Sequence, residues 1–161
     1  MNKKKILLTA INAKYIHSNL AVYSLRANAG KYTAQVELAE FTINHRREEI
    51  LQGIFREKPD MVGFSCYIWN IEYVLDVAEN LKKILPGIKI LLGGPEVSYD
   101  AIQRLEGHEY VDMIIAGEGE NTFRELLEWY CEGRPYKELE NICGLCYRDR
   151  SGEIHMTPAR G

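Results

Sequence analysis

The sequence lacks a dominant sign of charge and any long apolar run. Its 161 residues include 20 basic and 23 acidic side chains, and the two signs are interspersed along the chain. Such a mixture gives no electrostatic footprint for nucleic acid or for an anionic membrane. The apolar stretch over residues 6–10 is also far too short for a signal peptide or a membrane span. We therefore expect a cytoplasmic protein with no nucleic acid and no membrane among its partners.

The sequence has few cysteines, and they do not indicate a disulfide framework. The chain carries 4 cysteines, is long enough to bury its own core and shows no secretion signal, so we expect reduced thiols. Cys143 and Cys146 have the C-x-x-C spacing of a zinc site or a redox pair, but a structural zinc ion requires four ligands and no second pair is present. The segment also has the pattern of a strand, in which positions three apart point to opposite faces. We interpret the pair as two ordinary thiols.

The sequence also lacks the common catalytic and phosphate-binding signatures. No G-x-G-x-x-G follows the first expected strand, and there is no G-x-x-x-x-G-K-[ST], no H-E-x-x-H and no nucleophile elbow. Ser65 has no hydrolase pattern around it, and His17 has no evident acid partner. The chain therefore shows no catalytic constellation of its own.

A repeated strand-and-helix pattern is present instead. Apolar runs begin near residues 5, 34, 60, 88 and 111, with helical patterns between them. This alternation predicts an α/β fold, Rossmann-like and flavodoxin-like, with a five-stranded parallel sheet covered by helices on both faces. Residues 6–8, 61–64 and 90–92 are almost wholly apolar, as in central strands, whereas residues 35–38 and 111–113 include charges and suit the edges. The expected strand order is 2-1-3-4-5.

The helix signals differ in strength. The clearest helix has its apolar face over residues 71–85 and ends before Pro86, and the last one is expected to enter at 121–122 with a capping box formed by Thr122 and Glu125. Weaker helices are expected over residues 20–30, 46–58 and 98–105.

The repeat ends beyond residue 135. Residues 142–147 and 153–156 read as a hairpin, with no helix after it. We therefore divide the chain into a ligand-binding domain, 1–135, and a hairpin and linker, 136–161, that leads toward a further domain.

Small residues follow several of the expected strands. The segments 63–65, 93–96 and 117–120 each place glycine after an apolar run. Ligands of open parallel sheets bind beyond the carboxyl ends of the strands, where glycine lets them approach the main chain. The loop 12–20, which holds His17, closes the same rim. The pattern predicts a ligand site at this rim.

These segments resemble the cobalamin-binding domain of methionine synthase, of corrinoid proteins and of many radical S-adenosylmethionine enzymes, over about residues 3–133. In that family an Asp-x-His-x-x-Gly motif follows the first strand, a Gly-x-Ser-x-Leu type segment ends the third, and Gly-Gly ends the fourth. The corresponding segments here are Tyr-Ile-His-Ser-Asn-Leu at 15–20, Gly-Phe-Ser-Cys-Tyr at 63–67 and Gly-Gly-Pro-Glu at 93–96.

The resemblance implies roles for individual residues. Ser65 would bind the base of the nucleotide tail or line its channel, and Gly93 and Gly94 would let the tail pass close to the backbone. His17 is the candidate lower ligand of cobalt, but Tyr15 stands where the family has the carboxylate that orients the imidazole, which favours a looser contact of this loop with the corrin. The implied cofactor-binding residues are Asn12, Tyr15, His17, Ser18, Asn19, Leu20, Ser65, Tyr67, Gly93, Gly94, Pro95, Glu96, Gly117, Glu118 and Gly119.

A second resemblance covers the rim segments together with the terminal hairpin. It is to the amino-terminal half of cobalamin-dependent radical S-adenosylmethionine proteins, which include methyltransferases and the anaerobic magnesium-protoporphyrin ester cyclase. In those proteins the hairpin leads into a barrel with a C-x-x-x-C-x-x-C motif, a spacing that this sequence lacks. The resemblance implies that this chain binds cobalamin and presents it to a radical domain in cis, where S-adenosylmethionine and the iron–sulfur cluster would bind. We do not expect the chain to be catalytic alone.

Two alternatives remain open. A flavodoxin-like or receiver-like module would bind FMN or accept a phosphoryl group. However, Ser65 and Asn12 stand where a receiver needs acids, and the loop 12–20 offers only Ser18 where a flavodoxin needs a phosphate loop rich in small hydroxyl residues and glycine. Alternatively, the chain is only an interaction surface for the missing barrel, in which case the aromatic residues Tyr67 and Trp69 would matter more than the glycines.

Overall fold

The computed structural model describes residues 3–13 and 20–161. Its strands are β1 (Ile6–Asn12), β2 (Val36–Thr42), β3 (Met61–Ser65), β4 (Lys89–Gly93), β5 (Met113–Ile115), β6 (Leu145–Arg148) and β7 (Ile154–Met156). Its α-helices are α1 (Leu20–Ala27), α2 (Arg47–Glu57), α3 (Ile71–Ile84), α4 (Ala101–Gly107) and α5 (Glu120–Cys131). Three 3-10 helices, Gly30–Gln35, Pro95–Val97 and Tyr136–Asn141, complete the elements. Within the described ranges, none of the helices has both the length and the apolar content that crossing a bilayer requires.

All strands belong to one sheet with the order β2-β1-β3-β4-β5-β6-β7. The first five are parallel in the predicted order, and β6 and β7 form the predicted antiparallel hairpin. The predicted edge position of β5 is wrong, because β6 pairs with it and continues the sheet. The charge that suggested an edge, Asp112, lies just before β5 and accepts a hydrogen bond from Lys82 Nζ at 2.6 Å, so it is neutralised inside the protein.

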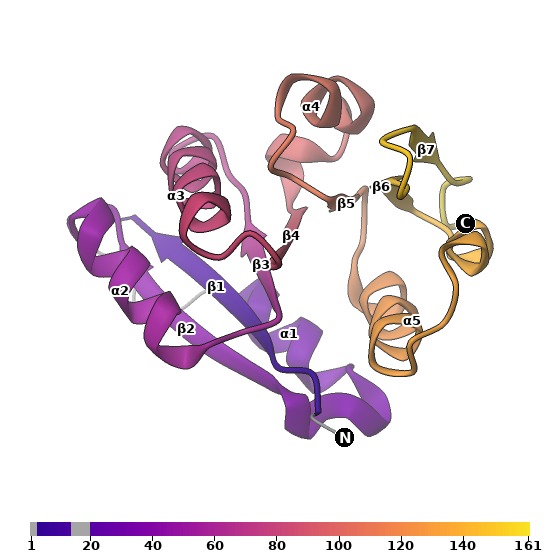
Figure 1. Cartoon of the computed structure of the whole chain (residues 1–161), viewed down its shortest axis with the longest axis horizontal. Helices are drawn as coiled ribbons and strands as arrows, with labels where there is room; N and C mark the ends of the chain where they lie inside the picture. Colours follow the sequence, from indigo (N-terminus) through magenta and orange to yellow (C-terminus); the bar gives the residue numbers. More distant parts are fainter. Residues whose placement is uncertain (1–2, 14–19) are drawn as a thin grey trace.

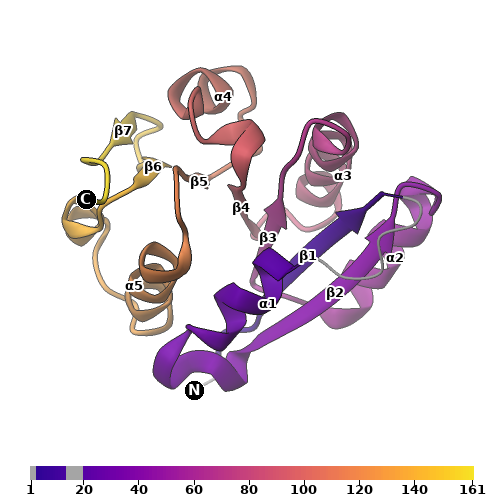
Figure 2. The ribbon, with the colours of Figure 1, turned by 180° about the vertical axis from the view of Figure 1, so that it is seen from behind.

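Helices cover both faces of the sheet, as predicted. In Figure 1, α3 and α4 lie above the strands and α1 and α5 below them, and Figure 2 shows the same layers from behind. Alternate residues of each strand therefore enter different cores. Leu7 and Ile11 pack with α2, α3 and α4, whereas Ile6 and Leu8 pack with α1 and α5. Because β1 and β3 are buried along their whole length, they form the centre of the molecule.

The helix boundaries follow from local chemistry. Helix α3 ends at Ile84, just before Pro86, where its predicted stop lies. The predicted capping box of α5 is wrong, because this helix begins one turn earlier, at Glu120, with the Phe123 N–H bonded to the Gly119 carbonyl at 2.7 Å. Thr122 thus lies inside the helix, and its hydroxyl donates to the Cys143 carbonyl at 2.8 Å.

The C-terminal segment returns to the start of α5. Arg160 Nε donates to the Thr122 hydroxyl at 3.1 Å, and Arg160 Nη2 lies 3.0 Å from a carboxylate oxygen of Glu125. Cys146 points into the core beneath α4, where burial raises the pKa of its thiol to about 11. The hairpin is therefore part of the packed domain.

The sheet order allows a test of where the core lies. Ile90 in β4 is 0% exposed, whereas Ile84 at the end of α3 is 49% exposed. We expect Ile90→Ala to lower the free energy of unfolding by about 2–4 kcal/mol, since it leaves a cavity between the sheet and α3, and Ile84→Ala to change it by less than about 0.5 kcal/mol. Urea denaturation of both variants measures the difference. Equal losses would contradict the arrangement.

Candidate functional site

The carboxyl ends of β3 and β4 lie side by side at the middle of the sheet. Ser65 pairs with Gly93 in the parallel register, and the Cys66 N–H donates to the Gly93 carbonyl at 2.7 Å, which carries the ladder one residue beyond β3. The turns that follow therefore begin at the same level of the rim. Any ligand that binds at this rim meets both turns.

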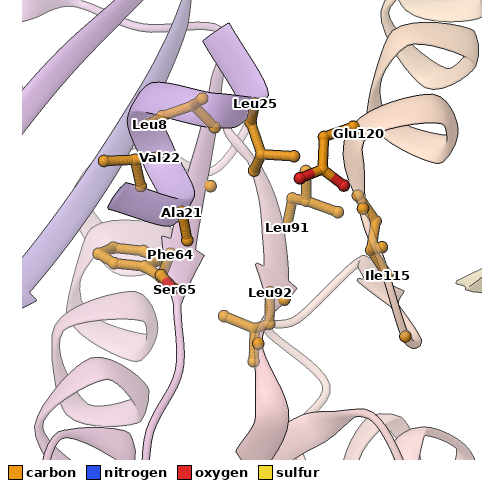
Figure 3. Close-up of a pocket in the computed structure, with 15 residues that line it drawn as sticks. Leu8, Ala21, Val22, Leu25, Phe64, Ser65, Leu91, Leu92, Ile115 and Glu120 are labelled. Carbon is orange, nitrogen blue, oxygen red and sulfur yellow. The ribbon is translucent and has the colours of Figure 1, made fainter. Parts of the chain in front are cut away.

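A cavity opens at this rim on the face covered by α1 and α5. It encloses about 620 Å³ of space, part of it open to solvent. Figure 3 shows its lining, with α1 on one side and the entry of α5 on the other. Most of the lining is apolar, and it includes Leu8, Val22, Leu25, Leu91 and Ile115. Such a narrow apolar slot suits a flat, largely apolar group.

Glycines keep the floor of the cavity open. A Cβ on Gly63 would lie 2.9 Å from Leu8 Cδ2, and one on Gly93 would meet only Ile115, at 3.9 Å. Gly63, Gly93 and Ser65 face the same side of the sheet as Leu8 and Leu91. Gly63 therefore lets the Leu8 and Leu91 side chains pack directly against β3, while the absence of a side chain at Gly93 leaves main chain open to a ligand.

Gly94 has a different reason to be glycine. Its φ is 104° and its ψ is 172°, a conformation that is essentially restricted to glycine. A Cβ at this position would lie 2.5 Å from the carbonyl oxygen of Cys66 and 2.8 Å from its nitrogen. The turn after β4 thus packs directly on the main chain that leaves β3.

The turn after β5 closes the other side of the cavity. Gly119 lies against α1, since a Cβ there would be 3.2 Å from Leu25 Cδ2, and the Ser24 hydroxyl donates to a Glu120 carboxylate oxygen at 3.0 Å. The Ser98 hydroxyl donates to the Gly94 carbonyl at 2.8 Å and accepts from the Gly117 N–H at 3.1 Å. Helix α1 and the turns after β4 and β5 are therefore joined around the cavity.

A buried amide orders the base of the rim. Asn70 is 1% exposed, and its Nδ2 donates to the carbonyls of Ile11 and Ser65, each at 3.0 Å. Its Oδ1 accepts from the Tyr67 N–H at 2.8 Å. Asn70 thereby joins the ends of β1 and β3 to the start of α3. Sequence reasoning missed this residue, although an Asn directly before a helix is a recognisable signal.

The thiol beside Ser65 is chemically quiet. Cys66 is wholly buried and points to the opposite core, with α3 and α4. Burial raises the pKa of its thiol to about 12, so it stays protonated at neutral pH. Among the described residues, the polar side-chain groups that line the cavity are the Ser65 hydroxyl and the Glu120 carboxylate.

The structure brings together one part of the predicted site. Five of the predicted residues line the cavity: Ser65, Gly93, Gly94, Gly117 and Gly119. Pro95 and Glu118 line a neighbouring hollow of the same rim. The sequence reasoning missed Glu120 and the wall contributed by α1, namely Ala21, Val22 and Leu25. Only the weak helical pattern over residues 20–30 hinted at that wall.

Other predicted residues do not line the cavity or lie outside the residues that the structure describes. Asn12 Nδ2 donates to Glu40 at 3.4 Å, Glu96 lies 3.4 Å from Arg104, and the Tyr67 ring stacks on Trp69 with 4.4 Å between centroids. Leu20 is the first residue of α1, and its side chain is not described. Tyr15, His17, Ser18 and Asn19 lie outside the described residues.

Comparison with known families shows which family this chain belongs to. The model of the family described as B12 binding domain matches residues 6–127, which include every strand of the parallel sheet and the start of α5. The chain belongs to the B12 binding domain family. Its cofactor is therefore cobalamin. The match confirms the resemblance to cobalamin-binding domains that the rim segments indicated.

Relatives of this B12 binding domain are much longer proteins. It is 40% identical over 112 residues to a 2-(S-pantetheinyl)-carbapenam-3-carboxylate methyltransferase of Streptantibioticus cattleyicolor, covering 70% of this chain and 16% of that protein. It is 28% identical over 134 residues to the anaerobic magnesium-protoporphyrin IX monomethyl ester cyclase of Rubrivivax gelatinosus, covering 81% of this chain and 24% of that protein.

A solved structure shares the fold. The cobalamin-dependent S-adenosylmethionine radical enzyme OxsB, solved with aqua-cobalamin and S-adenosylmethionine bound, superposes with a TM-score of 0.74 at 16% identity. The match covers 99% of this chain and 22% of that one, so the hairpin belongs to the shared fold. The chain thus spans less than a quarter of each of these proteins.

The cavity fits the cofactor of the family. Cobalamin carries a nucleotide tail with a flat aromatic base, and the apolar slot beside Leu8 and Leu91 has the lining that such a base requires. Gly93 leaves space that a side chain would fill. The Ser65 hydroxyl has no hydrogen-bond partner among the described residues, so it can bind a ring nitrogen.

The Gly94 conformation gives a prediction about stability. We expect Gly94→Ala to lower the free energy of unfolding by about 3 kcal/mol or more, since a Cβ would strain the backbone and collide with the main chain of Cys66. Gly87→Ala, in a turn where a Cβ meets nothing within 4 Å, is the matched control and should change it by less than about 1 kcal/mol. Thermal denaturation of both variants decides. A Gly94→Ala variant as stable as the control would refute the close packing.

The Asn70 amide gives a second prediction. Asn70→Ala removes three hydrogen bonds and leaves two buried carbonyls without them, so we expect a loss of about 2–4 kcal/mol in the free energy of unfolding. Asn80→Ala, whose amide bonds only within its own helix, should cost less than about 1 kcal/mol. Chemical denaturation measures both. Similar losses in the two variants would show that Asn70 does not order the rim.

Proposed function

We propose that this chain binds the nucleotide tail of cobalamin in the cavity between α1 and the ends of β3 and β4, and presents the corrin ring to a radical S-adenosylmethionine domain in cis. The observation that carries the proposal is the apolar cavity with a glycine floor at the carboxyl rim. Ligands of parallel sheets bind at this edge. Here the cavity lies where the strand order reverses, beside β1 and β3.

Two groups would orient the tail. The Ser65 hydroxyl projects into the cavity from the last residue of β3 and would bind the base, while Gly93 and Gly94 would let the tail pass close to the backbone. Asn70 holds the Ser65 carbonyl and therefore acts as a positioning residue for this hydroxyl. The apolar walls would exclude water from the base.

The corrin ring would lie over the rim itself. The stacked pair of Tyr67 and Trp69 follows β3, and Tyr99, 96% exposed, follows β4. Large exposed aromatic side chains at one edge support a contact with a flat ring or with a second domain. The loop around His17 would face the lower side of the ring, in the looser contact that Tyr15 favours over ligation of cobalt.

The reaction would take place in a domain outside this chain. Bound cobalamin supplies the organometallic chemistry, while this chain binds, orients and shields it. The named relatives are a methyltransferase and a cyclase, and each is several times longer than this chain. We infer methyl transfer or a related radical reaction for the whole protein. The division into residues 1–135 for the cofactor and 136–161 for the connection belongs to the same proposal.

Titration with hydroxocobalamin tests the tail pocket. We expect saturable binding that Ser65→Ala weakens roughly five-fold, by loss of one hydrogen bond, and that Ser65→Leu weakens at least about 100-fold, because the larger side chain fills the slot. Absorbance spectra and co-elution on gel filtration measure binding. Ser151→Leu, in the turn of the hairpin, is the control and should bind as the parent does.

Circular dichroism confirms that each variant is folded. Unchanged affinity in the folded Ser65→Leu variant would place the tail elsewhere. Absence of any spectral change with the folded parent chain would overturn the proposal as a whole.

A further inference from the structure

A second cavity lies at the amino ends of the parallel strands, opposite to the cobalamin rim. It lies between the starts of β1, β4 and β5, the last turn of α5 and the β6–β7 hairpin, and encloses about 1090 Å³ of space, part of it open to solvent. Five basic and two acidic side chains line it, although the chain as a whole has a formal net charge of −3. The lining of this cavity therefore has a net positive charge, opposite in sign to that of the whole chain.

The two acids are engaged by groups of the protein. Asp112 lies 2.6 Å from Lys82 Nζ, and its carboxylate also accepts from the Ile90 N–H at 2.8 Å. Asp149 accepts from His155 Nε2 at 2.7 Å, and this bond is the first cause of a pKa well below the usual range of that carboxyl. The five basic side chains still outnumber these two carboxylates, so the lining as a whole is positively charged.

The cations, in contrast, have few acid partners. Of the five, only Arg134 forms an ion pair with a carboxylate, that of Glu132, within the described part of the chain. The Arg148 guanidinium is held by carbonyl oxygens, with the shortest bond, 2.7 Å, to Leu105. No carboxylate of the described residues pairs with the remaining three, Lys4, Lys89 and Arg150. Positive charge is thus in excess at the amino ends of the strands.

Aromatic rings hold these cations in place. Lys89 Nζ donates to the Tyr136 hydroxyl at 2.8 Å, and the Arg150 guanidinium lies 5.4 Å from the centroid of the same ring. Lys4 Nζ lies 5.2 Å from the centroid of Tyr130. Cation–π contacts of this kind fix the positions of the charges before a ligand arrives, which lowers the entropy lost on binding.

The end of α5 does not cancel this positive charge. A helix C-terminus carries partial negative charge on its free carbonyls. Here the carbonyls of Glu128, Trp129 and Tyr130 accept from the N–H groups of residues 132, 134 and 133. These bonds satisfy the exposed end of the helix, so the side-chain cations determine the electrostatic potential in the cavity.

We propose that this cavity binds a small phosphorylated molecule with a planar ring, for which a nucleoside diphosphate is the simplest probe. The cations Lys89, Arg148 and Arg150 provide the charge that a phosphate group prefers. The aromatic side chains Trp129, Tyr130 and Tyr136 provide an apolar wall for the ring. This site lies at the opposite edge of the sheet from the cobalamin cavity and does not depend on it.

Isothermal titration of the chain with ADP, inorganic phosphate and adenosine tests the proposal. We expect saturable ADP binding that is at least tenfold tighter than adenosine binding, with phosphate alone binding more weakly than ADP. Raising the salt concentration from about 0.05 M to about 0.5 M should weaken ADP binding, since it screens the exposed cations. Failure of ADP to bind at millimolar concentration, or adenosine binding as tight as ADP binding, overturns the proposal.

Substitutions locate the site. Lys89→Gln combined with Arg150→Gln should weaken ADP binding at least tenfold while leaving the affinity for hydroxocobalamin within about twofold. Lys137→Gln removes one positive charge next to Tyr136 but outside the cavity, and should leave ADP binding within about twofold. Unchanged ADP affinity in the folded double variant would show that any binding occurs elsewhere, and that the cavity is not the site.

Discussion

The contact between the turn after β4 and the main chain after β3 is the constraint on which the rim depends. At Gly94 the backbone adopts a conformation that is essentially restricted to glycine, and it approaches Cys66 so closely that no side chain fits between them. The Glu96 N–H then donates to the Cys66 carbonyl at 3.3 Å, and Ser98 extends the connection to the turn after β5. Main-chain contacts and the Ser98 hydroxyl therefore fix three strand ends relative to one another, and a cavity with an exposed backbone floor can persist beside them.

Much of the fold could be predicted because burial leaves a direct trace in the composition of strands. The runs at 6–8, 61–64 and 90–92 are apolar on both faces and occupy the centre of the sheet. The fifth strand has its predicted place in the order, but it was wrongly predicted to be an edge strand because Asp112 looks like an edge residue until its partner Lys82, 30 positions away, is known. The start of α5 was misplaced because Thr122 resembles a cap but bonds to the hairpin instead. Both errors concern polar groups whose partners are distant in the sequence.

The candidate site likewise contains some residues that the sequence indicates and others that it does not. Glycines at strand ends are recognisable in the sequence, since few other roles explain them, and those at 93, 94, 117 and 119 line the cavity. The wall from α1 could not be predicted, because Ala21, Val22 and Leu25 are ordinary apolar residues that acquire meaning only when the helix lies over β3 and β4. Asn70 was missed for a related reason: its three bonds join segments that meet only in the folded chain.

The carboxyl ends and the amino ends of the strands carry different kinds of residues, and the sheet topology explains this difference. In a parallel sheet the carboxyl ends of the strands lead into turns, and there glycine and exposed main chain provide an apolar slot with backbone access. At the amino ends of the strands, long charged and aromatic side chains of residues 4, 89, 136, 148 and 150 lie together. These residues follow no pattern in the sequence. A flat cofactor tail therefore suits the carboxyl ends of the strands, and a charged ligand suits the amino ends. The antiparallel β6 strengthens this contrast, because its direction brings Arg148 to the amino edge and leaves the glycine of the preceding turn, Gly144, beside the carboxyl rim.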